Sequence, residues 1–152
     1  MGEADLLFQL DGDADVMKYI TLGIPRTLDE VIEKSMPRIL KSYQDKTDFG
    51  IFAAYLINSE KYIGWFQFEE DKEFEHSIEI GWRLKKQYWG NGYATEVATV
   101  LCDLGIKMGK TIVARAMIEN LASIRVMEKA GLKFEKKFWY PHSSSPDVLY
   151  KR

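Results

Sequence analysis

The middle of the chain carries the apolar and polar pattern of β-strands. Residues 50–57 (GIFAAYLI) and 62–68 (YIGWFQF) are rich in aromatic and β-branched side chains and flank a polar turn, which predicts a β-hairpin. After a second polar turn at 69–72, residues 74–84 (FEHSIEIGWRL) alternate between two faces. Glu79 and Arg83 fall on one face, whereas His76 falls on the other together with the apolar residues.

Helical spacing begins earlier in the chain. Residues 27–30 form a capping box, in which the Thr27 hydroxyl and the Glu30 carboxylate each accept a hydrogen bond from the first turn of a new helix. Apolar residues then recur with the period of a helix at Ile32, Met36, Ile39, Leu40 and Tyr43. Pro37 removes a backbone donor inside this pattern, so we expect a kink or two short helices.

The second half of the chain alternates helices with strands. An amphipathic helix that ends at Gly109 is predicted from the apolar positions Val97, Val100, Leu101, Leu104 and Met108. A strand at 111–118 follows, then a short helix from the N-cap Asn120 through Lys129, and two strands at 132–139 and 147–151. This order predicts a mixed α+β fold with one central, mostly antiparallel sheet flanked by helices.

Composition and charge narrow the class of protein. The 152 residues, 46% of them hydrophobic, are sufficient for one soluble domain, which we place at 1–152. The net charge of −2 lacks the basic excess of nucleic-acid-binding proteins. The acidic N-terminus does not resemble a signal peptide, and no apolar run is long enough to cross a membrane. The lone cysteine, Cys102, suggests a buried thiol in a reducing compartment, so we expect a cytoplasmic protein.

The most informative segment joins the strand at 74–84 to the helix that follows it. Gly90 and Gly92 lie two residues apart in the connecting turn, which contains no acidic residue. Backbone N–H groups at a helix start bind phosphate, and glycine lets an anionic oxygen approach closely. Arg83, Lys85 and Lys86 add local positive charge. The competing interpretation is a tight turn with a structural role only.

Two sequence blocks resemble one enzyme family. Residues 87–94 (QYWGNGYA) resemble the Gln/Arg-x-x-Gly-x-Gly/Ala signature of the GNAT superfamily of acetyltransferases. Residues 120–134 (NLASIRVMEKAGLKF) resemble the Asn-x-x-Ser and Gly-Phe motif of its ribosomal-protein N-acetyltransferase (Rim-like) branch. The resemblance implies a single N-acetyltransferase (GNAT) domain with acetyl-CoA as the cosubstrate and no metal.

The resemblance also implies roles for individual residues. The strand end formed by Trp82, Arg83 and Leu84 would pair with the pantetheine arm of the cofactor. The glycine turn would bind the pyrophosphate through Gln87, Trp89, Gly90, Asn91, Gly92, Tyr93, Ala94 and Thr95. Asn120 would bond the pantetheine portion and Ser123 would lie near the sulfur, although both could serve only the helix start.

The reaction would be attack by an amine on a thioester, which requires a base and an acid. Glu79 is our candidate for the base, directly or through water; the alternative is a solvated carboxylate. Many members of the superfamily have a tyrosine as the general acid where this chain has Met127. Ser123 or Tyr140 could replace it, or the thiolate could leave unassisted, since a thiol pKa is about 8.5.

The acceptor is less well defined. The resemblance suggests a protein or peptide α-amino group or a small-molecule amine. The acidic stretch at 69–75 could attract a cationic amine or could be a solvated turn. Phe138, Trp139, Tyr140 and His142 could form a loop over the acceptor or pack a homodimer.

Two expectations concern catalysis and the N-terminus. A chain with Met127 in place of the tyrosine could be a CoA-binding sensor or regulatory subunit. Family members usually have a first strand before the segment that resembles residues 15–20. Residues 6–10 (LLFQL) could be the remnant of that strand, or a partner chain could supply the sheet edge.

Overall fold

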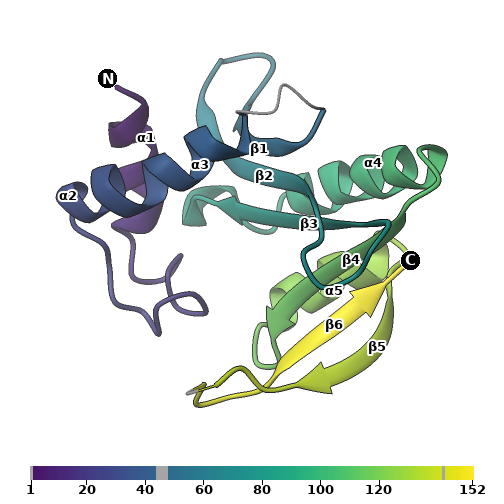
Figure 1. Cartoon of the computed structure of the whole chain (residues 1–152). Helices are drawn as coiled ribbons and strands as arrows, with labels where there is room; N and C mark the ends of the chain where they lie inside the picture. The colour runs from purple at the N-terminus through teal and green to yellow at the C-terminus, as the bar shows by residue number, and fades with distance from the viewer. Residues whose placement is uncertain (1, 44–47, 142) are drawn as a thin grey trace. The chain divides into compact units, whose positions relative to one another are not determined.

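A computed structural model of the chain describes residues 2–43, 48–141 and 143–152. The helical elements, coloured by position in Figure 1, are α1 (Glu3–Asp11), α2 (Leu28–Glu30), the π-helical η1 (Val31–Ser35), α3 (Met36–Ser42), the 3-10 helix η2 (Lys86–Tyr88), α4 (Tyr93–Lys107) and α5 (Leu121–Lys129). The strands are β1 (Gly50–Tyr55), β2 (Tyr62–Glu70), β3 (Ser77–Leu84), β4 (Thr111–Met117), β5 (Lys133–Phe138) and β6 (Asp147–Lys151). The strands form a six-stranded sheet in the order β1-β2-β3-β4-β6-β5.

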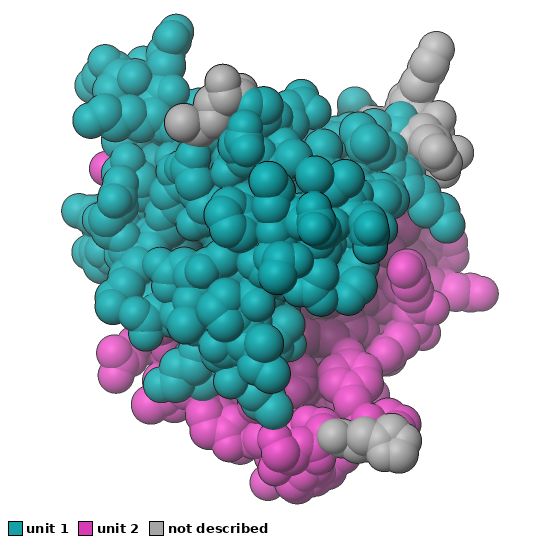
Figure 2. All heavy atoms as spheres, turned by 90° about the vertical axis from the view of Figure 1, so that its left-hand side faces the viewer, with its two compact units in different colours: residues 1–67, 82–91 teal, residues 68–81, 92–152 magenta. Residues whose placement is uncertain are grey.

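The chain divides into two compact units, shown in different colours in Figure 2. The first contains residues 1–67 and 82–91, and the second contains residues 68–81 and 92–152. The boundary between the units falls within β2 and within β3. Residues 62–67 of β2 and 82–84 of β3 belong to the first unit, and residues 68–70 of β2 and 77–81 of β3 belong to the second.

The predicted N-terminal strand is wrong, because residues 6–10 lie inside helix α1. Leu6, Leu7 and Leu10 recur at helical spacing, and Leu7 and Leu10 are buried. Asp5 stabilises the helix start by accepting a hydrogen bond from the Gly2 N–H at 2.8 Å. The core of the first unit contains Leu7, Leu10, Val16, Val31, Ile51, Tyr62 and Trp65.

The helical segment at 27–43 confirms the expected start and the expected interruption. The Glu30 N–H donates to the Thr27 hydroxyl at 3.2 Å, and the Thr27 N–H donates to the Glu30 carboxylate at 3.1 Å. Pro37 lies in the first turn of α3, immediately after the π-helical segment η1. The helix is therefore divided into three short pieces, because proline cannot continue the regular pattern of hydrogen bonds.

The strands confirm the predicted mixed sheet. β1 and β2 are neighbours, and the Leu56 N–H closes their turn by donating to the Lys61 carbonyl at 3.0 Å. In the second unit β3 pairs parallel to β4, whereas β6 pairs antiparallel to both β4 and β5. One detail differs from the prediction: β3 begins at Ser77, and His76 precedes it with a φ of 58°. This left-handed residue ends the turn, so His76 has no place on a strand face.

Helix α4 ends at Lys107, two residues before the predicted stop at the left-handed Gly109, and it buries a different face from the predicted one. Val100, Leu104 and Met108 are exposed, whereas the residues buried on this helix are Ala98, Cys102 and Gly105. A Cβ added at Gly105 would lie 2.2 Å from Cδ1 of Ile112 on β4. The helix therefore packs on the sheet through its small residues, because larger side chains would hold it further away.

Candidate active site

The glycine turn is held by two side chains of its own segment. The Trp89 Nε1–H donates to the Leu84 carbonyl at 2.8 Å, and the Asn91 amide donates to the Trp89 carbonyl at 3.1 Å. Gly90 and Gly92 have φ values of 76° and 86°, a left-handed conformation that favours glycine. The sequence therefore needs glycine at both positions to connect β3 to α4.

The space in front of this turn is open. A Cβ built at Gly90 or at Gly92 would meet no heavy atom within 4 Å. Gly92 is the N-cap of α4, and its carbonyl accepts the first helical hydrogen bond, from the Glu96 N–H at 2.9 Å. The amides of the first turn, at 93–95, have no intrahelical acceptor and lie at the positive end of the helix dipole. This geometry suits an anionic ligand.

The three cationic residues before the turn are engaged by the N-terminal segment. Arg83 pairs with Asp11, Lys86 pairs with Asp15 at 2.5 Å, and Lys85 donates to the Gln9 side chain. The positive charge expected here is therefore partly neutralised. An open cavity of about 690 Å³ lies in the same unit and is lined by Gln9, Asp13, Lys85, Lys86 and Gln87.

Asn120 is the N-cap of α5, and it uses only the oxygen of its side-chain amide for the cap. Its Oδ1 accepts a hydrogen bond from the Ser123 N–H at 3.2 Å, which confirms the predicted cap of α5. No described residue forms a hydrogen bond with its Nδ2 or with the Ser123 hydroxyl. Both side chains can therefore serve a ligand without disturbing the cap. Met127 is buried in the same helix, with 1% of its surface exposed.

Glu79 is part of an ion-pair cluster centred on Arg115. Nη1 of Arg115 lies 3.0 Å from Glu79 and 2.5 Å from Asp71, and Nη2 lies 3.2 Å from Glu73. The Arg115 guanidinium also lies 5.8 Å from the centre of the Phe74 ring. Glu79 retains 31% side-chain exposure, so its carboxylate can still contact water.

The pKa values within this cluster follow from burial and pairing. Burial of the Arg115 guanidinium acts to lower its pKa. The hydrogen bonds and charges of Asp71 and Glu79 outweigh this effect, so the pKa of Arg115 is raised. Burial acts to raise the pKa of Asp71, and hydrogen bonds from Arg115 and from the backbone reverse this and lower it. Asp71 is therefore ionised at neutral pH.

Ion pairing within the acidic stretch at 69–75 is more extensive than its sequence suggests, although Glu70, Glu73 and Glu75 stay exposed. Asp71 and Glu73 are paired with Arg115, and Glu70 lies 3.6 Å from Lys110. An open cavity of about 460 Å³ is lined by Glu70, Asp71, Glu75, His76, Ser77 and Lys110. The stretch is therefore neither a uniform acidic surface nor a fully solvated turn.

Tyr140 belongs to an aromatic pair near the same carboxylates. Its ring lies edge-on to Phe138 with 5.1 Å between the ring centres. Burial raises the pKa of Tyr140, and Glu73, Asp147 and Glu79 add to the effect against the charge of Arg115. The hydroxyl therefore stays protonated at neutral pH. His142, which we expected in the same loop, lies outside the described residues.

Sequence reasoning missed two charged residues, Asp11 and Arg115. Arg115 interrupts the apolar strand 111–117, and an arginine at such a position requires a buried partner. That irregularity could have identified it. Asp11 has no comparable local signal, because its partners lie 15, 24 and 72 residues away.

Comparison with known proteins agrees with the sequence motifs. Residues 2–133 match the model of the acetyltransferase (GNAT) domain. The uncharacterized N-acetyltransferase YnaD of Bacillus subtilis (strain 168) is 32% identical over 135 residues, which cover 87% of this chain and 74% of that protein. The chain therefore belongs to the GNAT acetyltransferase family.

Solved structures share the fold. A GNAT-family acetyltransferase from Bacillus anthracis is 28% identical, with a TM-score of 0.79 over 99% of this chain and 88% of that one. RimL, a ribosomal L7/L12 α-N-protein acetyltransferase solved with coenzyme A, has a TM-score of 0.76 at 15% identity, covering 98% of this chain and 86% of that one. The Rim-like branch itself stays a prediction, because this identity supports the fold alone. Along the described part of the chain, no helix has the length and apolar character needed to span a bilayer.

Proposed function

We propose that the chain transfers the acetyl group of acetyl-CoA directly to a primary amine. The observation that carries this proposal is the open, left-handed Gly90-Asn91-Gly92 turn at the start of α4. An isolated turn of this kind is weak support, but here it coincides with the signature of the family to which the chain belongs. The domain that performs the reaction is residues 1–152.

The proposed roles in cofactor binding follow the chain. The pyrophosphate accepts hydrogen bonds from the amides at the start of α4, between Gly90 and Thr95. The backbone of Trp82, Arg83 and Leu84 pairs with the pantetheine arm, and Gln87 borders the turn. Asn120 donates its Nδ2 hydrogens to a carbonyl of the same arm, while its Oδ1 keeps the helix cap.

The proposed chemistry forms a C–N bond and breaks the thioester C–S bond. The acceptor must lose a proton before it can attack, and Glu79 takes this proton through a water molecule on its exposed side. Arg115 holds the Glu79 carboxylate in place and offsets its charge. A backbone N–H near Leu84 stabilises the oxyanion.

The departing thiolate requires a proton source other than Met127. Ser123 is our first candidate, because its hydroxyl has no hydrogen-bond partner among the residues that the structure describes. Tyr140 is the second, because it stays protonated at neutral pH. Loss of each hydroxyl in turn, in Ser123→Ala and Tyr140→Phe, distinguishes the two by the fall in turnover.

The acceptor class that we propose is a primary amine, either a protein α-amino group or a small cationic amine. A panel containing peptides with free N-termini, polyamines and aminoglycosides tests this proposal, with release of free CoA thiol as the measurement. Turnover with peptides alone would assign the Rim-like activity on protein α-amino groups, and turnover with polyamines or aminoglycosides alone would assign a small-molecule acceptor. We expect at least one class to react well above the rate of hydrolysis.

A second candidate function is a CoA-binding sensor without catalysis. The observation that favours it is the buried Met127 at the position of the usual tyrosine acid. Binding of acetyl-CoA without turnover of any amine would support the sensor. If neither acetyl-CoA nor CoA raises the unfolding temperature, both functions are wrong.

A further inference from the structure

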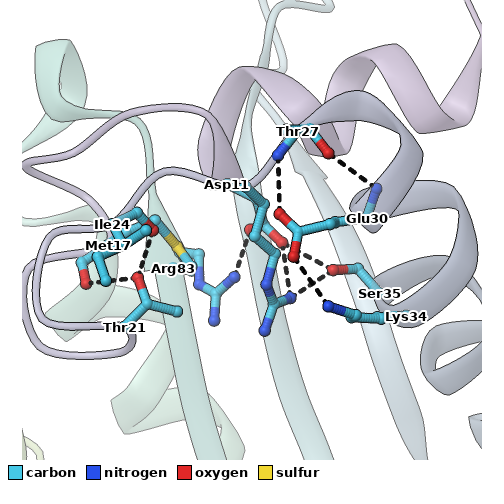
Figure 3. A network of polar contacts seen from close by, with 10 residues as sticks. Asp11, Met17, Thr21, Ile24, Thr27, Glu30, Lys34, Ser35 and Arg83 are labelled. Carbon is cyan, nitrogen blue, oxygen red and sulfur yellow. Dashed lines mark hydrogen bonds and ion pairs between the residues drawn. The ribbon is translucent and has the colours of Figure 1, made fainter.

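Asp11 is a buried carboxylate that connects four separate segments of the first unit. It ends helix α1 and has no exposed surface. Its Oδ2 accepts hydrogen bonds from Arg26 Nη1 at 3.1 Å and from the Ser35 hydroxyl at 2.8 Å. Its Oδ1 accepts from Nη1 of Arg83, at the end of β3. Figure 3 shows Asp11 and Arg83 pointing toward each other.

Arg83 is held from a second side as well. Its guanidinium lies 5.0 Å from the centre of the Trp65 ring, and only 14% of the side chain is exposed. Burial lowers the pKa of Arg83, and the Asp11 charge opposes this effect. A guanidinium confined between an indole ring and a carboxylate cannot reach a phosphate group, so its role concerns the strand that carries it.

The end of β3 is also fixed through its backbone. A Cβ at Gly64 on β2 would lie 2.1 Å from the Arg83 carbonyl oxygen and 2.8 Å from the Leu84 Cα. The Lys85 N–H donates to the Ile63 carbonyl at 2.9 Å, and the Trp89 indole donates to the Leu84 carbonyl at 2.8 Å. These contacts hold the backbone, whereas Asp11 holds the one charged side chain in residues 82–84.

We propose that Asp11 is a positioning residue for acetyl transfer, which acts through Arg83 to fix the backbone of residues 82–84. The inference rests on the proposed function, in which this backbone pairs with the pantetheine arm. Asp11 contacts neither cofactor nor acceptor. Its loss leaves Arg83 and Arg26 without the carboxylate that both share, so the strand end moves to let Arg83 reach water.

The test compares two ligands that differ in the arm. Acetyl-CoA has an adenosine diphosphate portion and the pantetheine arm, whereas ADP has the adenosine diphosphate portion without the arm. In Asp11→Asn we expect the Kd for acetyl-CoA to rise at least tenfold and the Kd for ADP to change less than twofold, both by calorimetry. General damage to the fold would weaken both ligands equally, and that result would overturn the inference.

Ser35→Ala is the matched control. It removes a different hydrogen bond from the same carboxylate and leaves Arg83 in place. We expect a lower unfolding temperature with an unchanged ratio of the two Kd values. If the ratio of the Kd for acetyl-CoA to the Kd for ADP is no larger in Asp11→Asn than in Ser35→Ala, the proposal is wrong.

A second variant is available if Asp11→Asn does not fold. Arg83→Lys keeps the charge but loses the planar contact with Trp65 and the reach to Asp11, so we expect the same selective loss of acetyl-CoA affinity. Wild-type protein that binds neither ligand would overturn the proposed function and this inference together. Wild-type protein that binds acetyl-CoA, with both variants binding it equally well, would overturn this inference alone.

Discussion

Arg115 and Asp71 form an almost fully buried ion pair between β4 and the turn that follows β2. The two residues are 44 positions apart in sequence, and their side chains meet at 2.5 Å with 9% and 2% of their surfaces exposed. The pair holds the turn at 71–76 against the sheet. Because Glu79 shares the same guanidinium, the pair also orients the proposed base.

Asp71→Asn should lower the free energy of unfolding by about 2–4 kcal/mol at pH 7, because it leaves a buried guanidinium with less compensating charge. The pKa of Asp71 is lowered in the folded protein, so its contribution is fully present above the ordinary value of 3.8 and is lost as pH falls through the folded pKa. Urea unfolding of both proteins from pH 7 to pH 3 measures this. A difference that stays constant down to pH 3 would contradict the assigned shift.

Gly92→Asp should abolish the rise in unfolding temperature caused by acetyl-CoA, because it places a carboxylate and a Cβ where the pyrophosphate would bind. At a ligand concentration 100 times Kd, the wild-type protein should gain about 2.7 kcal/mol, or roughly 5–10 °C. Gly109→Asp is the matched control, since Gly109 has a φ of 73° and open space at the other end of α4. Equal shifts in both variants would move the phosphate site elsewhere.

Asn120→Asp should separate the helix cap from the contact with the cofactor. Aspartate caps a helix as well as asparagine, so stability should be retained, whereas the Nδ2 donor is lost. We expect a rise of roughly 2–10-fold in the Kd for acetyl-CoA. Asn120→Ala should show the same loss of affinity and also destabilise the protein by about 1 kcal/mol. Unchanged affinity in both variants would leave Asn120 as a cap only.

Glu79→Gln should lower kcat by about 10²–10⁴-fold with the amine that the wild-type enzyme acetylates, because the proposed route for the proton is removed. Glu73→Gln is the matched control. Glu73 pairs with the same Arg115 but is 52% exposed. Steady-state rates of free thiol release compare the two variants. Equal rates in both would assign Glu79 to the ion-pair cluster and not to proton transfer.

The parts of the fold that were predictable from sequence depend on contacts between near neighbours. The Thr27 and Glu30 capping box and the Asn120 cap each connect residues three positions apart, so the local sequence contains the whole interaction. The φ values of Gly90 and Gly92 are likewise dictated within one turn. The two glycines were therefore sufficient to place the start of α4.

The features that were missed depend on distant parts of the chain. The buried face of α4 is set by the close approach of Gly105 to Ile112, and hydrophobicity alone favours the larger residues on the neighbouring stripe. Asp11 looks like an ordinary acidic residue until Arg26, Ser35 and Arg83 surround it. The positive charge expected at the glycine turn was overestimated because Arg83, Lys85 and Lys86 contact residues about 70 positions earlier in the chain.

The buried position of Cys102 has a practical consequence for every assay of this enzyme. The thiol has no exposed surface, and burial raises its pKa, so a thiol-specific dye should not react with the folded protein. Because the chain has one cysteine, the colour that develops during turnover can be assigned to released CoA. The same dye, added without substrate, reports the rate at which the second unit opens.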